Sequence, residues 1–119
     1  GGGREAWPKR LLPDCYRRSS GDRYQSIYGR MWWDRPGPTM TTLCTGLGNG
    51  RFGHPEQDRA ITLREAALIQ SFPKRYEFWP KDVKLNRGAV AQMIGNAVPP
   101  RLAKALGQAI VKHVEKHMA

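Results

Sequence analysis

The clearest pattern along the chain is an apolar stripe near its end. Four apolar residues recur there every four positions, which is the spacing of side chains on one face of an α-helix. Proline is favoured in a first helical turn, so the pattern predicts a helix from Pro100 to about His117. Because an apolar stripe is favourable only when it is covered, we expect this helix to pack on something. The stripe consists of Leu102, Leu106, Ile110 and Val114.

A capped helix is predicted before it. Thr62 and Glu65 have the spacing of a capping box, in which each side chain pairs with the other's backbone N–H, and an apolar stretch surrounds Glu65. The helix is expected from Leu63 to about Ser71. Pro73 ends it, because the residue before a proline is disfavoured in the helical conformation.

Between these two, a further helix is expected from about Asn86 to Ile94, with Gly95 as its C-terminal stop. Residues 95–100 then cannot be helical, since they run into two successive prolines that lack a backbone N–H. On the residues alone, this corner is a rigid connector in which Asn96 caps the preceding helix. The face of the helix expected to be buried holds Ala89, Val90 and Met93.

The first half of the chain follows other patterns. Residues 1–23 are broken by proline, serine and glycine, so we expect them to be extended, basic and irregular. Aromatic residues are dense over 24–33 and β-branched residues over 39–44, which predicts two short strands, and the glycines of 46–53 predict a flexible loop. The predicted fold class is therefore α+β, with short strands or a hairpin first and three α-helices after.

Charge narrows the class of partner. The 119 residues hold 20 Lys plus Arg against 10 Asp plus Glu, a net charge of +10, which favours a polyanion such as nucleic acid. No apolar run approaches the length of a membrane span, and the first residues have no signal-peptide core, so we expect a cytoplasmic protein and no membrane partner. Cys15 and Cys44 are too few for a disulfide scaffold, although one disulfide between them stays open.

Two formal motifs are discarded. Residues 48–53 match GxGxxG, but a dinucleotide-binding motif must open a helix, and His54 and Pro55 follow instead. His113 and His117 are four residues apart on a predicted helix, but no third ligand is evident, so we expect no metal site.

Residues 62–73 and 92–104 together resemble the last two shared motifs of the DNA cytosine-5 methyltransferases. Residues 28–30, 36–41 and 51–55 are similar to the end of that family's target-recognition region. The resemblance implies that residues 1–58 end the recognition region. It also implies that residues 59–119 form a helical segment that packs on the catalytic domain and completes a Rossmann-like methyltransferase.

The resemblance also implies two sites. In the family, the corner before the last helix lines the S-adenosylmethionine pocket, which points to Asn96 and Ala97, supported by Gly95 and Val98. A threonine and a glycine-rich loop of the recognition region approach double-stranded DNA. The alternative for that loop is a mobile hairpin that binds nothing. The positions that correspond to the family's DNA-binding residues are Thr41 or Thr42, Gly46, Gly48, Asn49 and Arg51.

The family's chemical machinery is missing from this chain. Neither Cys15 nor Cys44 follows a proline, as the family's nucleophile does, and the Glu-Asn-Val acid motif is absent. We therefore expect no catalytic residue here and no methyl transfer without a catalytic half, on a separate subunit or on the same chain, in a prokaryotic, nucleoid-associated enzyme. The alternatives are the remnant of a decayed methyltransferase and a small basic protein that binds nucleic acid without catalysis.

Overall fold

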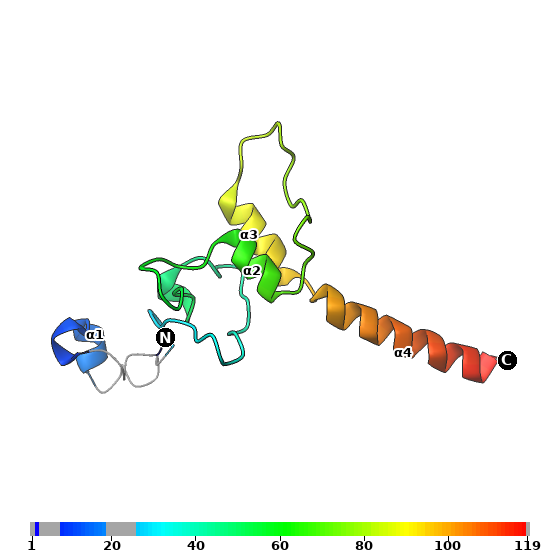
Figure 1. Cartoon of the computed structure of the whole chain (residues 1–119), viewed down its shortest axis with the longest axis horizontal. Coiled ribbons are helices and arrows are strands. Elements are labelled where there is room, and N and C mark those ends of the chain that lie inside the picture. The colour runs from blue at the N-terminus through cyan, green and yellow to red at the C-terminus, as the bar shows by residue number, and fades with distance from the viewer. Residues whose placement is uncertain (1, 3–7, 19–25, 119) are drawn as a thin grey trace.

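The computed structural model describes residue 2 and residues 8–18 and 26–118. Within these residues the chain forms a small helical body from which one long helix projects (Figure 1). The first residues of the strand expected over 24–33, and much of the irregular segment expected over 1–23, lie outside the described residues. The elements are η2 (Lys9–Leu11), α1 (Asp14–Arg17), η4 (Leu47–Asn49), α2 (Leu63–Ile69), α3 (Arg87–Asn96) and α4 (Pro100–Met118).

The expected strands are not formed, so the α+β prediction is wrong for the part of the chain that is described. Extended segments meet only at isolated bridges, which join Gly2 to Arg30, Arg30 to Gly53, and Gly53 to Ala60. Residues 41–46 form two successive turns and not a strand. The physical reason is that β-branched residues favour a strand only where a neighbouring strand offers a surface to pair with, and no strand of the described residues lies beside this segment.

The loop after these turns is more regular than predicted. Its glycines frame the short 3-10 helix η4, and Gly50 takes a positive φ of 153° directly after it. Gly53 is buried and pairs with the backbone of Gly29, where a side chain on Gly53 would come 2.9 Å from the Gly29 carbonyl oxygen. Two chain segments therefore approach each other closely at this point.

Helix α2 confirms the predicted capping box. The Thr62 hydroxyl accepts from the backbone N–H of Glu65 at 3.2 Å, and the Glu65 carboxylate accepts from that of Thr62 at 2.7 Å. The helix ends two residues earlier than expected, in a Schellman motif with Ser71 in the left-handed region at φ 63°. Phe72 N–H donates to Ala67 and Ser71 N–H to Leu68, so the last carbonyls of the helix are satisfied before Pro73.

Helix α3 departs from the prediction in two ways. It begins after Asn86, whose side chain caps Ala89 N–H, but it continues through Gly95 and Asn96. Gly95 is therefore not its stop, and Asn96 is its last residue and not a cap. The buried face also differs from the expected one, since Met93 is 47% exposed. The residues that are buried on α3 are Val90, Ala91 and Ile94.

The core lies between α2 and α3. Small side chains on both helices, Ala66 and Ala67 on α2 and Ala91 on α3, allow their backbones to approach closely. The preceding loops supply the other side of the core. Its remaining buried members are Met31, Met40, Cys44, Phe52, Ile61, Val90 and Ile94.

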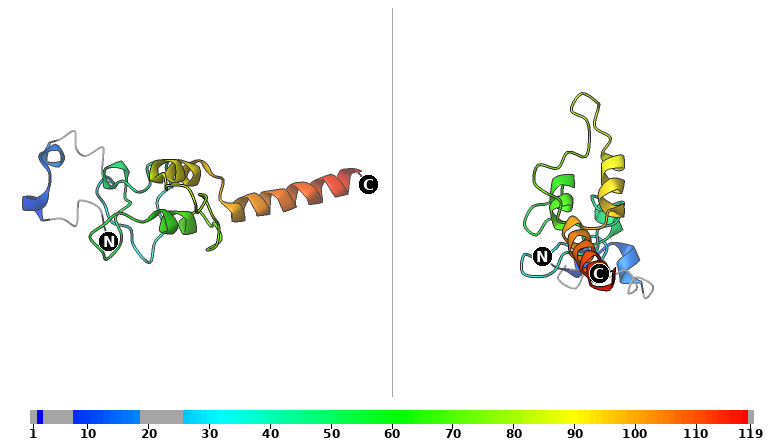
Figure 2. Two further views of the ribbon diagram at one scale, coloured as in Figure 1. Left: turned by 90° about the horizontal axis from the view of Figure 1, so that it is seen from above. Right: turned by 90° about the vertical axis from the view of Figure 1, so that its right-hand side faces the viewer.

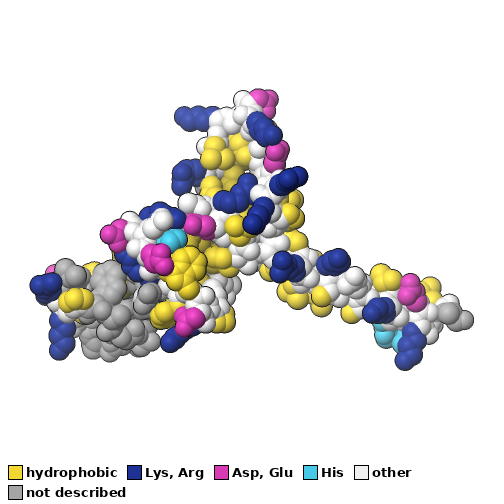
Figure 3. Space-filling view, in the orientation of Figure 1, with side chains coloured by type: hydrophobic (Ala, Val, Ile, Leu, Met, Phe, Trp, Pro, Cys, Tyr) yellow, Lys and Arg dark blue, Asp and Glu magenta, His cyan; other side chains and the backbone are white. Residues whose placement is uncertain are grey.

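Helix α4 is confirmed with nearly the predicted bounds, but it covers none of this core. It has no buried residue, and it extends from the body as the long arm of a molecule measuring 66 × 41 × 25 Å (Figures 1 and 2). Apolar side chains lie exposed along it (Figure 3). Its stripe residues Leu102, Leu106, Ile110 and Val114 are 51%, 53%, 63% and 42% exposed.

The two cysteines are not joined. Cys15 is exposed and Cys44 is fully buried, and both are free thiols. Burial raises the pKa of the Cys44 thiol. Among the described helices, none is long and apolar enough to cross a membrane.

Candidate functional site

The residues predicted for two separate sites lie against each other. Gly95, from the corner expected to face a cofactor, packs directly on the backbone between Thr41 and Thr42, from the segment expected to face DNA. A side chain at Gly95 would come 2.3 Å from the carbonyl carbon of Thr41 and 2.4 Å from the nitrogen of Thr42. Glycine is required here because of this close approach and not because the helix ends.

The corner is also held from α2. Gln70, the C-cap of α2, donates through its side-chain amide to the carbonyl oxygen of Ile94 at 3.0 Å and to that of Ala97 at 3.2 Å. These are carbonyls at the end of α3, where intrahelical partners run out. One side chain thus fixes the direction in which the chain leaves α3.

Two residues of the corner, Asn96 and Val98, are exposed. Asn96 lies on the surface, and its side chain forms no hydrogen bond with any other described residue. Val98 is 60% exposed and Ala97 is half-buried. The corner therefore offers one amide and one apolar side chain outward from a fixed backbone.

The candidate DNA residues form a continuous turn and loop. Thr41 accepts from Cys44 N–H, and after the second turn Gly46 accepts from Asn49 N–H at 3.1 Å. The Asn49 amide folds back over Gly46, where a side chain would lie 2.3 Å from its nitrogen. Gly48 is exposed beside the ring of Tyr28.

Arg51 follows this loop and is half-buried. Its guanidinium carbon lies 4.2 Å from the ring centre of Trp32, within the range of a cation–π contact. Its side chain also packs on Gly29, which has no side chain to obstruct it. Arg51 is thus ordered by an aromatic residue that the sequence patterns did not single out.

Glu65 is the centre of the polar contacts around α2. Arg59 binds it through two N–H groups, at 2.7 Å to Oε2 and 2.8 Å to Oε1. The hydrogen bonds from Arg59, followed by those of the capping box, lower the pKa of Glu65 from 4.5 to about 2. A carboxylate held this way stays ionised, so its role is structural and not that of an acid or base.

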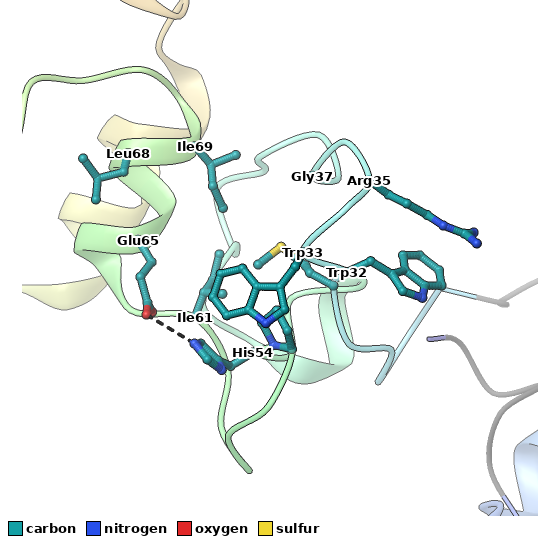
Figure 4. A pocket seen from close by; sticks show the side chains of 11 residues that line it. Trp32, Trp33, Arg35, Gly37, His54, Ile61, Glu65, Leu68 and Ile69 are labelled. Atoms are coloured by element: carbon teal, nitrogen blue, oxygen red, sulfur yellow. Dashed lines mark ion pairs between the residues drawn. The ribbon is translucent and has the colours of Figure 1, made fainter. Parts of the chain in front are cut away.

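His54 occupies a similar structural position. Its Nδ1 accepts from the backbone N–H groups of Glu56 and Gln57 at 3.2 and 3.0 Å, and its Nε2 lies 3.8 Å from Glu65 (Figure 4). Because Nδ1 is an acceptor, the hydrogen of the neutral ring is on Nε2. The ring meets Trp33 edge to face and forms one wall of a cavity of about 290 Å³.

The sequence model for C-5 cytosine-specific DNA methylases matches residues 6–112. The chain belongs to this family. Similar proteins include the type II methylase M.HgiDII of Herpetosiphon aurantiacus, 52% identical over 92% of this chain, and the type II methyltransferase M1.BsuMI of Bacillus subtilis, 44% identical over 83%. DNA (cytosine-5)-methyltransferase 1A of Oryza sativa is 39% identical over 87% of the chain.

This C-5 cytosine methylase chain matches only part of each relative. It spans 30% of M.HgiDII, 22% of M1.BsuMI and 6% of the rice protein. A stretch of this size within larger methyltransferases agrees with the prediction that the chain is one portion of such an enzyme.

Three contributors to the site were missed from the sequence. The clamp by Gln70 gives no local signal, because its partners lie 24 and 27 residues away. The only signal for His54 in the sequence is its position directly after the glycine loop. Trp32 stood among dense aromatic residues, and its nearness to arginines in the sequence was the one available hint.

Proposed function

We propose that this chain is the DNA-recognition and cofactor-pocket-closing portion of an S-adenosylmethionine-dependent DNA cytosine-5 methyltransferase. The observation that carries the proposal is the contact of Gly95 with Thr41 and Thr42. Through it, the segment proposed to face DNA and the corner proposed to face the cofactor belong to one packed unit. A part that closes a cofactor pocket over a flipped base needs this kind of fixed relation between its two faces.

The corner suits a polar ligand with an apolar portion. The Asn96 amide offers both a donor and an acceptor, and Val98 offers exposed apolar surface beside it. Two hydrogen bonds from Gln70 hold the backbone there. When bound, S-adenosylmethionine supplies the methyl group. The residues of this chain bind and orient the cofactor, with Asn96 and Ala97 nearest to it and Gly95 and Val98 in support.

On the DNA side, we assign contacts to the turn and loop from Thr41 to Arg51. Exposed backbone at Gly48 allows close approach to phosphate or base edges, and Asn49 and Arg51 supply donors. The net charge of +10 favours the same polyanion. The residues assigned are Thr41, Thr42, Gly46, Gly48, Asn49 and Arg51.

The partner is a catalytic part of the methyltransferase. Helix α4 leaves its whole apolar stripe exposed, with Ile110 at 63%, and no described residue covers it. Such a face on a long helix is stable in water only when another surface packs on it. A catalytic part that supplies the nucleophile and covers α4 accounts both for the absence of a nucleophile motif in this chain and for the exposed apolar stripe of α4.

Reconstitution tests this proposal. The chain is combined with the part of M.HgiDII outside the matched region, and methyl transfer from labelled S-adenosylmethionine to DNA is measured. We expect activity from the mixture and none from either part alone. If both parts are folded and bind each other but transfer no methyl group, the chain is a remnant, or it binds nucleic acid without catalysis, and the proposal is wrong.

The cofactor assignment has its own test in the reconstituted enzyme. Asn96→Ala should weaken S-adenosylmethionine binding about tenfold, the loss of one or two hydrogen bonds, with little change in DNA affinity. Isothermal titration gives the first quantity and fluorescence anisotropy the second. Equal losses in both would assign Asn96 to the fold and not to the pocket.

A further inference from the structure

Two arginine side chains lie over one indole ring. The guanidinium carbon of Arg51 lies 4.2 Å from the ring centre of Trp32, and that of Arg35 lies 4.7 Å from it. The negative face of the ring attracts each guanidinium, and contact with it limits the rotation of both long side chains. Trp32 thereby positions two positive charges against one ring.

Within the described residues, these two arginines lack the acidic partner that neighbouring arginines have. Arg30 and Arg59 each form an ion pair with a carboxylate, whereas no described carboxylate pairs with Arg35 or Arg51. Nε of Arg51 is buried and has no hydrogen-bond partner among the described atoms. Two positive charges on one ring, with no carboxylate paired to either among the described residues, favour an anion bound beside them.

The pair lies next to the loop that we assign to DNA. Arg51 is the last residue of that loop, and its stem packs on Gly29, where a side chain would lie 3.0 Å from Cγ of Arg51. Gly48 lies beside the ring of Tyr28, the residue before Gly29. Trp32 and Arg35 lie side by side, away from the Glu65 wall of the cavity (Figure 4). The loop and the two arginines therefore share one region of the molecule.

We propose that Arg35 and Arg51, positioned by Trp32, form a binding site for the phosphodiester backbone of DNA. A guanidinium presents paired N–H groups that match phosphate oxygens, and a contact to phosphate fixes the register of a protein on DNA without reading its sequence. The inference deepens the proposed function and rests on it. It adds Arg35 and Trp32 to the DNA-facing residues.

The salt dependence of DNA binding tests the site in the reconstituted methyltransferase. Affinity for a short fluorescent duplex is measured by anisotropy over a salt series for the wild type, Arg35→Ala, Arg51→Ala and Arg35→Lys. Each lost phosphate contact should reduce the slope of log affinity against log salt by about 0.9. Equivalently, the fall in affinity between about 50 and about 200 mM salt becomes about threefold smaller. Arg35→Lys keeps the charge and should keep the slope.

The matched control is Arg64→Ala. Arg64 is exposed on α2 and donates to the carbonyl of Tyr76, so its removal should leave the salt slope unchanged. The losses at Arg35 and Arg51 should be equal for target and non-target duplexes, because a phosphate contact carries no sequence information.

Three outcomes overturn the inference, and they differ from one another. If the wild type binds DNA with a clear salt slope and Arg35→Ala leaves that slope unchanged, the site is wrong while the proposed function stands. Because Arg35 is exposed, Arg35→Ala leaves the fold intact. The salt slope of this variant therefore tests the site even if Arg51→Ala unfolds. A loss confined to one target sequence would mean base contact instead of phosphate contact. If the wild-type assembly binds no DNA, the proposed function fails and the site with it.

Discussion

At the scale of single residues, Glu65 holds together more of the body than any local pattern suggested. Its carboxylate accepts from Arg59 on one side and from the backbone of Thr62 on the other, and His54 faces it from the cavity. The capping box alone accounts for only one of these contacts. Glu65 thus joins the start of α2 to the segment that precedes it, so its charge matters beyond its own helix.

The pKa of Glu65 leads to a prediction about pH. Its pKa falls from 4.5 to about 2 on folding, so the folded state binds this proton less strongly than the unfolded state does. The stabilisation is therefore complete above pH 4.5 and is lost as the pH falls towards about 2. Thermal unfolding of the wild type followed by circular dichroism should show this loss over that interval.

Glu65→Gln is the control, because glutamine still fills the capping box but carries no charge. This variant should be less stable than the wild type at neutral pH by about 1–3 kcal/mol and should lose less stability on acidification. A wild type and a variant with parallel pH profiles would mean that Glu65 contributes no charge-dependent stability.

Two glycines allow a matched comparison. A methyl group at Gly95 would meet the Thr41 backbone at 2.3 Å, whereas nothing lies within 4 Å of one at Gly107 on α4. Gly95→Ala should destabilise the body by about 3 kcal/mol, because the backbone cannot move aside without opening the core. Gly107→Ala should stabilise α4 by about 0.5–1 kcal/mol, the ordinary helix preference for alanine. Chemical denaturation measures the free energy of unfolding of both variants. If Gly95→Ala is no more destabilising than Gly107→Ala, the close contact at Gly95 is refuted.

At the scale of elements, the end of one helix organises the start of another. Ser71 takes the left-handed conformation that closes α2, and its hydroxyl accepts from the backbone N–H of Arg101 in the first turn of α4 at 3.1 Å. Glycine would fit the backbone better but would leave that N–H without its partner. Gln70, one residue earlier, holds the end of α3. Two adjacent residues thus fix both sides of the corner.

Substitution of Gln70 tests this clamp. Gln70→Glu removes the two N–H donors and places a carboxylate against the carbonyls of Ile94 and Ala97, so it should destabilise the body by about 2–3 kcal/mol. Gln92→Glu makes the same chemical change at an exposed position of α3 and should have little effect. Both are compared by urea unfolding. In the reconstituted enzyme, Gln70→Glu should also weaken cofactor binding, and unchanged stability would exclude the clamp.

At the scale of the whole molecule, the described part of the chain leaves an apolar helix face exposed to water. Its core is confined to α2, α3 and the loops beside them, and α4 has no buried residue. The projecting helix keeps apolar side chains in water along its length (Figure 3). A molecule of this shape is favoured when a second surface covers the helix, which agrees with a match to only 22–30% of its bacterial relatives.

The stripe on α4 predicts self-association of the isolated chain. Sedimentation velocity should show oligomers of the wild type. The affinity of self-association should be about tenfold lower in Leu106→Lys, because burial of a leucine is worth about 1.5–3 kcal/mol. Gln108→Lys adds the same charge away from the stripe and should change nothing. Leu106→Lys should also fail to reconstitute methyl transfer. A chain that is monomeric at all concentrations, with or without the substitution, would show that the stripe does not mediate self-association.

The sequence by itself determined the elements whose stability is local. The capping box, the proline after α2 and the stripe of α4 act over a few residues, so their helices were predicted to within two residues at each end, and the family motifs predicted two sites. Only the tertiary structure decided what depends on distant partners. The expected strands have no neighbouring strand among the described residues, and Gly95 is fixed by its contact with Thr41 rather than by its own helix. The Gln70 clamp and the arginines on Trp32 join segments whose approach no local pattern encodes.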